Sequence, residues 1–259
     1  MILVASRPMA LRSKRLLPIA ALAAAALTGR TAGAPPSLQA FSKESFRPKA
    51  AARIPIRYLL YLPQGYSRRQ AWPLILFLHG SGERGNDLGQ VTRHGIPKQI
   101  SEGRQMPFIV VSPQCPEGMV WEDLPLMALL DTIEKDHRVD PSRIYVTGLS
   151  MGGYGTWDLV IRHPERFAAA APVCGGGSTV RLILLSAEDR KALQKVGIWA
   201  FHGESDDVVG FQESERLVAA IKAAGGTAKL TRYPKVGHDS WVQAYNDPAL
   251  LPWFLEHKR

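Results

Sequence analysis

The sequence predicts an α/β domain with a mainly parallel sheet that is covered by helices on both faces. Three observations support this fold class. Short apolar runs, many rich in branched residues, alternate with segments of helical spacing along most of the chain. The length of 259 residues suits one large domain, and 46% hydrophobic and 21% charged residues are ordinary for a globular protein. Finally, a strand-like run at 143–147 passes through Gly148-Leu149-Ser150-Met151-Gly152 into a helical segment at 154–162.

The expected elements follow one another in the order that such a sheet requires. Residues 74–78 are a continuous apolar run, which is typical of a central strand buried on both faces. Residues 124–138 place leucines and an isoleucine at helical spacing, and Asp140-Pro141 ends that helix. Strands are expected at 57–62, 74–78, 108–111, 143–147, 167–173, 197–201 and 228–233, and helices at 124–138, 154–162, 212–224 and 248–257.

The N-terminal region indicates an export signal. Arg12-Ser13-Lys14-Arg15 precedes an Ala/Leu-rich run at 16–27, and Ala32-Gly33-Ala34 offers a small-residue cleavage site. The apolar run is too short for an ordinary membrane span, and no cysteine lies near it for a lipid anchor. We therefore expect a secretory signal peptide over 1–34, a linker or loose arm over 35–53, and the folded domain over 54–259. This organisation implies a secreted or periplasmic protein without a stable membrane anchor; an unprocessed N-terminal tail is the alternative.

The charge distribution argues against a nucleic-acid partner. The formal net charge is +9, but residues 1–34 hold five basic residues and no acid. Removing these five from the 32 basic residues leaves 27 against 23 acidic ones, and no basic patch interleaved with aromatic residues stands out. The sequence also lacks H-E-x-x-H and C-x-x-C patterns, so we expect neither a metal site nor a cofactor.

The two cysteines, Cys115 and Cys174, are expected to remain free and partly buried. Each follows an expected strand, and the strands at 74–78 and 144–146 should lie between them in the sheet. Adjacent strands are about 4.8 Å apart, whereas a disulfide needs Cα atoms within about 7 Å. A disulfide would therefore require both loops to fold inward.

Ser150 is the candidate nucleophile, because a G-x-S-x-G turn between strand and helix exposes the serine hydroxyl. A serine needs a histidine to take its proton and a carboxylate to orient that histidine. His238 follows the strand at 228–233 and is the candidate base. Asp206 follows the strand at 197–201 and is the candidate acid, with Asp207 and then Glu204 as the alternatives.

The glycine-rich stretch after the central strand is a candidate oxyanion hole. It reads Leu78-His79-Gly80-Ser81-Gly82, and its turn can direct backbone N–H groups at a developing oxyanion. We assign the hole to the backbone N–H groups of Ser81 and Met151. Trp121, Trp241 and Arg84 are the candidate substrate-binding residues; packing of the two aromatic rings and bracing of the loop by the arginine are the alternatives.

Five stretches resemble one family of bacterial enzymes. They are 74–85, 111–116, 148–157, 171–177 and 237–241, whose sequences include LHGSGERG, SPQCP, GLSMGGYGTW, APVCGGG and GHDSW. The family comprises carboxylesterases of the α/β-hydrolase superfamily, described as phospholipase/carboxylesterase-like or as predicted peptidases, and neighbours the polyhydroxybutyrate depolymerases and feruloyl esterases. The resemblance implies an α/β-hydrolase fold and a Ser150–His238–Asp206 triad. Two departures are visible: Gly210 replaces the family's usual proline, and 178–195 differs from its usual acidic continuation.

The expected function is serine-dependent hydrolysis of carboxylic esters through an acyl-enzyme. A serine peptidase on the same triad, and a non-catalytic binding protein on a hydrolase scaffold, are the alternatives. The interval 175–196 has only 22 residues, so at most one or two short helices fit and a cap domain should be minimal or absent. We therefore expect an open cleft walled by Trp121, Trp241 and residues 81–87, which could accept a small or a polymer-attached ester.

Overall fold

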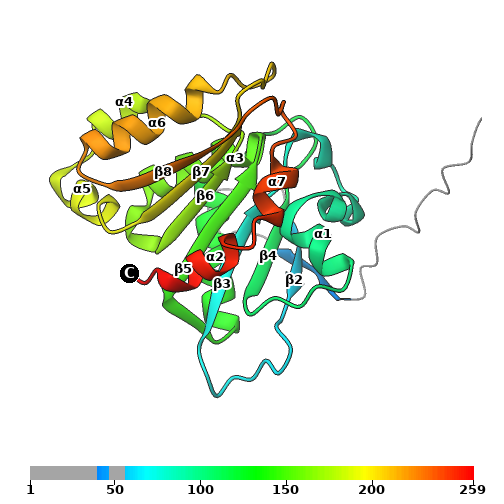
Figure 1. Ribbon diagram of the computed structural model, residues 1–259. Helices are drawn as coiled ribbons and strands as arrows, with labels where there is room; N and C mark the ends of the chain where they lie inside the picture. The colour runs from blue at the N-terminus through cyan, green and yellow to red at the C-terminus, as the bar shows by residue number, and fades with distance from the viewer. Residues whose placement is uncertain (1–39, 47–55) are drawn as a thin grey trace, which may run out of the picture. The chain divides into compact units, whose positions relative to one another are not determined.

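An eight-stranded sheet organises the domain in the computed structural model, which describes residues 40–46 and 56–259. Within these residues the strand order is β1-β2-β4-β3-β5-β6-β7-β8 (Figure 1). The strands are β1 Ser42–Phe46, β2 Ile56–Tyr61, β3 Trp72–Leu78, β4 Ile109–Gln114, β5 Val139–Leu149, β6 Ala169–Val173, β7 Gly197–Gly203 and β8 Thr227–Tyr233. Every pairing from β4 to β8 is parallel, while β2 is antiparallel to both of its neighbours. The mainly parallel sheet that the sequence predicts is confirmed.

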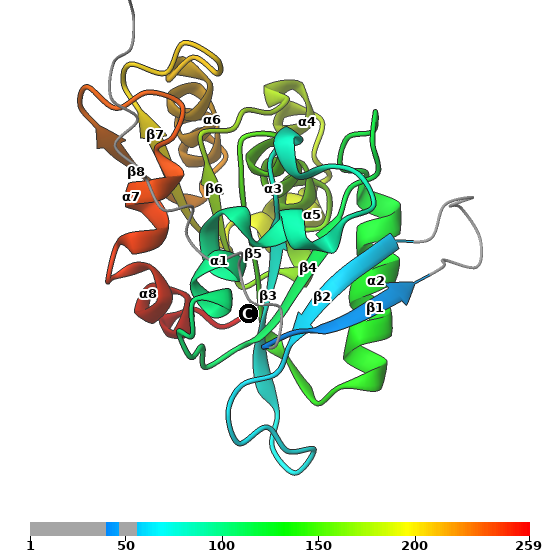
Figure 2. The same cartoon turned by 90° about the vertical axis from the view of Figure 1, so that its right-hand side faces the viewer.

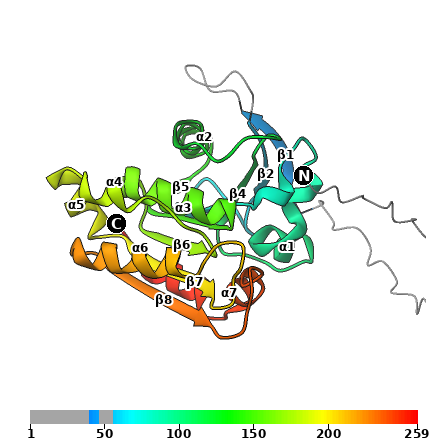
Figure 3. The same ribbon diagram turned by 90° about the horizontal axis from the view of Figure 1, so that it is seen from above.

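Helices cover both faces of this sheet, as Figures 2 and 3 show from two directions. They are α1 Gly95–Ser101, α2 Asp123–Asp136, α3 Met151–Arg162, α4 Thr179–Ile183, α5 Ala187–Leu193, α6 Gln212–Ala223, α7 Trp241–Asn246 and α8 Leu250–Glu256. Helices α2 to α6 pack in one apolar cluster, and α1, α7 and α8 pack in the other. Strand β3 sends Leu74, Leu76 and Leu78 into the first cluster and Ile75 and Phe77 into the second. This double burial explains its continuous apolar sequence.

Strand β1 lies inside the segment that the sequence analysis assigns to a linker. It pairs antiparallel with β2, with Lys43 opposite Leu59 and Glu44 opposite Tyr58. Residues 42–45 are exposed, so the strand is held mainly by backbone pairing and shows no apolar alternation. The expected signal peptide at 1–34, and residues 35–39 and 47–53 of the expected linker, lie outside the described residues.

Two short helices, α4 and α5, occupy the interval between β6 and β7, which agrees with the minimal cap expected from its length. Cys115 and Cys174 are both buried and free. Cys115 follows β4 and Cys174 follows β6, and strands β3 and β5 lie between β4 and β6 in the sheet, as predicted. Within residues 40–46 and 56–259, no helix has the length and apolarity needed to cross a membrane.

Candidate active site

Ser150 occupies a strained turn between β5 and α3. Its backbone dihedral angles are φ 53° and ψ −116°, a positive φ that non-glycine residues rarely adopt. The turn also brings two backbone segments into close contact. A Cβ atom on Gly152 would lie 1.9 Å from the carbonyl oxygen of Leu78, and one on Gly148 would lie 2.5 Å from that of Gly152. The glycines of the G-x-S-x-G motif are therefore required by the space available at the turn.

His238 connects Ser150 to Asp206 by two hydrogen bonds. The Ser150 hydroxyl lies 2.8 Å from His238 Nε2, and His238 Nδ1 lies 2.8 Å from Asp206 Oδ2. The backbone N–H groups of Val208 and Val209 donate to Asp206 Oδ1 at 3.0 and 2.9 Å. Oδ1 thus fixes the side chain to its loop, while Oδ2 contacts the His238 ring and also lies 3.2 Å from His202 Nε2.

The surroundings of Asp206 keep its carboxylate ionised. Burial would raise its pKa, but hydrogen bonds from His238 and from the backbone N–H groups of Val209 and Val208 lower the pKa below its ordinary value. Asp207, the alternative acid, is exposed to solvent next to it. Glu204 is also exposed. The geometry therefore brings the first candidate of the sequence analysis to the histidine.

His79 and Arg84 fix the candidate oxyanion loop through contacts with backbone groups. Burial lowers the pKa of His79 to about 4, so the ring is neutral at pH 7. Its Nε2 accepts from the Cys115 N–H at 3.0 Å and its Nδ1 lies 2.6 Å from the Gly80 carbonyl. The Arg84 guanidinium donates to the carbonyls of Ser81 and Met119 at 3.0 and 3.2 Å. These hydrogen bonds support the alternative role of Arg84, in which it braces the loop and does not bind substrate.

Ser81 and Met151, the two candidate oxyanion residues, both begin short-range helical structure. Ser81 opens a 3₁₀ turn, Ser81–Glu83, directly after β3. Met151 is the first residue of α3, where backbone N–H groups lack an intrahelical acceptor and the helix dipole favours negative charge. Their positions at the ends of β3 and β5, which are adjacent in the sheet, are compatible with a shared oxyanion site.

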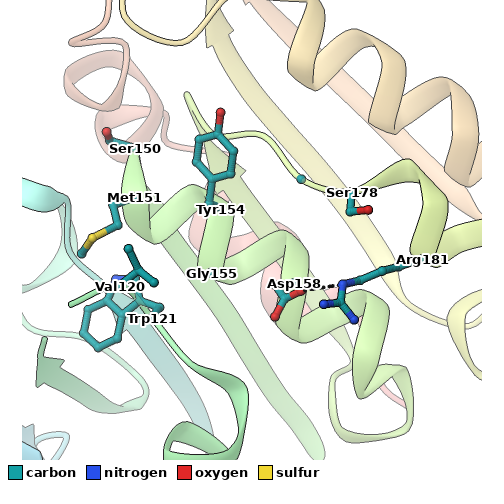
Figure 4. A pocket seen from close by; sticks show the side chains of 10 residues that line it. Val120, Trp121, Ser150, Met151, Tyr154, Gly155, Asp158, Ser178 and Arg181 are labelled. Atoms are coloured by element: carbon teal, nitrogen blue, oxygen red, sulfur yellow. Dashed lines mark ion pairs between the residues drawn. The ribbon is translucent and has the colours of Figure 1, made fainter.

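A cavity of about 620 Å³ opens beside Ser150 along α3 (Figure 4). Its lining comprises Val120, Trp121, Ser150, Met151, Tyr154, Gly155, Asp158, Gly177, Ser178 and Arg181. Trp121, one of the three candidate substrate residues, forms part of this lining. Trp241 and Arg84 do not; the Trp241 ring instead meets the His238 ring edge-on, with centroids 5.4 Å apart.

Asp158 and Arg181 form the far end of this cavity, which was not predicted from the sequence. Asp158 lies eight residues after Ser150, so helical spacing could have placed it on the same side of α3. Arg181 gave no comparable signal, because α4 is only five residues long. In the part of the chain that the structure describes, no group of His, Cys, Asp and Glu residues is arranged to hold a metal ion.

Comparison with known proteins reveals related hydrolases. Residues 88–247 match the family described as "Dienelactone hydrolase family". The chain is 31% identical over 150 residues to "Bifunctional acetylxylan esterase/xylanase XynS20E" of Neocallimastix patriciarum, a match of 55% of this chain and 20% of that protein. It is 24% identical over 227 residues to "Poly(3-hydroxyoctanoate) depolymerase" of Pseudomonas fluorescens, covering 78% of this chain and 80% of the relative.

A solved structure described as a thermostable esterase superposes with a TM-score of 0.72 at 32% identity. The match covers 86% of this chain and 64% of that structure. The chain thus spans about a fifth of the acetylxylan esterase/xylanase and just under two thirds of the esterase. The superposition confirms the fold class that the sequence predicts.

Proposed function

Because this chain belongs to the dienelactone hydrolase family, we propose that it hydrolyses carboxylic esters through an acyl-enzyme formed on Ser150. The observation that best supports the proposal is the continuous hydrogen-bonded connection from Ser150 through His238 to the buried Asp206. All three members of a serine hydrolase triad are present and in contact. This completeness disfavours a non-catalytic binding protein on the same scaffold.

The first half of the reaction forms the acyl-enzyme. Ser150 Oγ attacks the ester carbonyl carbon while His238 Nε2 takes its proton. Asp206 holds the Nδ1 proton and stabilises the imidazolium. The carbonyl oxygen becomes negative and accepts hydrogen bonds from the backbone N–H groups of Ser81 and Met151. In other serine hydrolases, the loss of one such donor costs about 10²–10³-fold in kcat. The C–O bond then breaks as His238 gives the proton to the departing alcohol.

The second half regenerates the enzyme. A water molecule gives a proton to His238 Nε2 and attacks the acyl carbon. The tetrahedral intermediate then collapses: the bond to Ser150 Oγ breaks, the proton returns to that oxygen, and the carboxylic acid leaves. A peptidase would use the same steps but must expel an amine, a poorer leaving group. The esterase named among the solved structures favours the ester reaction for this chain.

We extend the proposal to the substrate and its location. The serine lies beside an accessible cavity, and in the described part of the chain the interval between β6 and β7 holds two short helices and no inserted domain, so a bulky ester can approach. Two relatives are named for polymeric material, an acetylxylan esterase/xylanase and a poly(3-hydroxyoctanoate) depolymerase. We therefore propose a small or polymer-attached ester as substrate. The signal-like composition of residues 1–34 supports export of a catalytic domain whose sheet includes β1.

The experiment that tests the proposal compares wild type with Ser150→Ala on 4-nitrophenyl butyrate and on a peptide 4-nitroanilide. The wild type should hydrolyse the ester far faster than the anilide. The variant should keep its circular dichroism spectrum and lose about 10⁴–10⁶-fold in kcat, as other serine hydrolases do when they lose a triad residue. Retention of most ester hydrolysis by the purified variant would refute the role of Ser150, and faster anilide hydrolysis would favour a peptidase.

A further inference from the structure

The cavity beside Ser150 follows one side of helix α3. Met151, Tyr154, Gly155 and Asp158 all line it, at the spacings of three, four and seven residues that share a helix face. With a rise of 1.5 Å per residue, the distance along the helix from Met151 to Asp158 is about 10 Å. Figure 4 shows these side chains in sequence from the nucleophile to the Asp158–Arg181 pair. The cavity can therefore hold the part of the substrate that lies on one side of the ester bond, which is called its arm below.

This arm is the acyl group of the ester, if the proposed reaction holds. The departing alcohol oxygen must receive a proton from His238 Nε2, so it has to face that ring. The cavity lining contains Ser150 and Met151 but no residue of the His238 loop. An ester that presents its alcohol oxygen to His238 consequently directs its acyl group along α3.

The part of the cavity next to Ser150 suits the apolar portion of an acyl group. Val120, Trp121, Met151 and Tyr154 form it, and Val120 is 63% exposed although it is a large hydrophobic residue. The Trp121 indole N–H donates to the His79 carbonyl at 3.0 Å, which fixes the ring in place. An acyl chain lying here would remove apolar surface from water without finding a polar partner.

Charged side chains form the end of the cavity that is far from Ser150. Arg181 Nε lies 3.4 Å from Asp158 Oδ1, and the Arg162 guanidinium also contacts the Asp158 carboxylate, at 2.9 Å. One carboxylate shared between two arginines cannot saturate the five N–H donors of Arg181. The Arg181 side chain is 43% exposed, so a ligand can reach these donors. Arg162 also contacts Asp123, at 3.3 Å, so the cluster pairs two arginines with two carboxylates. The far end of the cavity therefore offers the remaining N–H donors of Arg181.

We propose that Arg181 is a specificity-determining residue that binds an oxygen acceptor at the far end of the acyl group, beside Asp158 and about 10 Å along α3 from Met151. The preferred acyl group then has an apolar body and a terminal oxygen, in a carboxylate or in a neutral carbonyl. This inference rests on the proposed function.

Three 4-nitrophenyl esters test the inference: octanoate, 7-oxooctanoate and the monoester of octanedioic acid. These acyl chains have similar length and differ at the far end only. The measured quantity is kcat/KM for each oxygen-bearing ester divided by kcat/KM for octanoate. Hydrogen bonds to charged groups correspond to about ten-fold or more in such a ratio. We expect wild type to prefer at least one oxygen-bearing ester by that factor and Arg181→Met to lose the preference.

Because all three esters are measured in the same preparation, partial unfolding of a variant changes neither ratio. Lys191→Met removes one positive charge from α5, outside the cavity lining, and should keep the wild-type preference. A preference for the octanedioate ester alone would show that Arg181 selects an anionic group. A preference for both oxygen-bearing esters would show that a neutral oxygen acceptor is sufficient. Equal kcat/KM for all three esters in wild type, or an unchanged preference in Arg181→Met, would overturn the inference while ester hydrolysis stands. Hydrolysis of none of the three by enzyme that hydrolyses 4-nitrophenyl butyrate would also overturn the inference, and hydrolysis of neither these esters nor the butyrate would refute the proposed function.

Discussion

Replacing Asp206 by Asn should leave the fold intact and reverse the proton arrangement of His238. The two hydrogen bonds from the Val208 and Val209 N–H groups both end on Oδ1, so an Asn keeps them by placing its carbonyl oxygen there. Its NH₂ group then occupies the Oδ2 position, 2.8 Å from His238 Nδ1. A donor now faces Nδ1, which must give up its proton and act as acceptor. The remaining ring proton is on Nε2, facing Ser150, where a free lone pair is needed.

The size of the effect follows from this tautomer reversal. The equivalent change in another serine hydrolase lowers kcat by about 10⁴ while the geometry is retained. At 1.36 kcal/mol per ten-fold, this corresponds to about 5.4 kcal/mol of lost transition-state stabilisation. Asp207→Asn is the matched control, since it removes the same charge from the adjacent exposed residue and should change kcat by less than about two-fold.

Initial rates with 4-nitrophenyl butyrate, measured on both variants at pH 8, provide the assay. Near-ultraviolet circular dichroism of Asp206→Asn establishes that the site is still folded. Equal losses in the two variants, or a larger loss in Asp207→Asn, would refute the assignment of the acid to Asp206.

Two further predictions concern the backbone and the thiols. Gly152→Ala should destabilise the fold by more than about 3 kcal/mol, because its Cβ would overlap the Leu78 carbonyl oxygen. Gly82→Ala should be nearly neutral, because no atom of the described residues beyond its two chain neighbours lies within 4 Å of the added Cβ. Urea unfolding measures the stability of both variants, and equal unfolding midpoints would contradict the close contact at the turn. Burial raises the pKa of Cys115 to about 11 and of Cys174 to about 12, so neither thiol should react with a thiol reagent at pH 8 until the protein is unfolded. Rapid labelling of the native protein would contradict the buried, protonated state of both.

The elements that the sequence predicted are those in which local pattern and tertiary burial agree. The run at 74–78 is buried on both faces, and this burial makes its apolar signal continuous. Strand β1 was not predicted, because an exposed edge strand held by backbone pairing needs no particular side chains. The triad candidates could be found because each follows a strand, and the carboxyl ends of parallel strands meet at one edge of the sheet.

Arg181, the proposed specificity residue, and its contact with Asp158 could not be found in this way. Asp158 and Arg181 come from α3 and α4, and their contact depends on how the two helices pack, which no local pattern encodes. The cavity lining also excludes Trp241, whose proximity to His238 in the sequence suggested a substrate wall. Its ring contacts the rings of His94 and His238, and this contact is decided by the tertiary position of α7.

The strained conformation of Ser150 has a consequence for laboratory evolution. A non-glycine residue held at such a backbone conformation costs on the order of 1–3 kcal/mol, a sizeable share of the roughly 5–15 kcal/mol by which a typical domain is stable. Glycine would relieve that strain and abolish the nucleophile. A library selected only for heat resistance would therefore enrich Ser150→Gly, and heat-resistant, inactive clones would accumulate at this position. Selection for thermal stability in this protein therefore has to be combined with a screen for catalytic activity in every round.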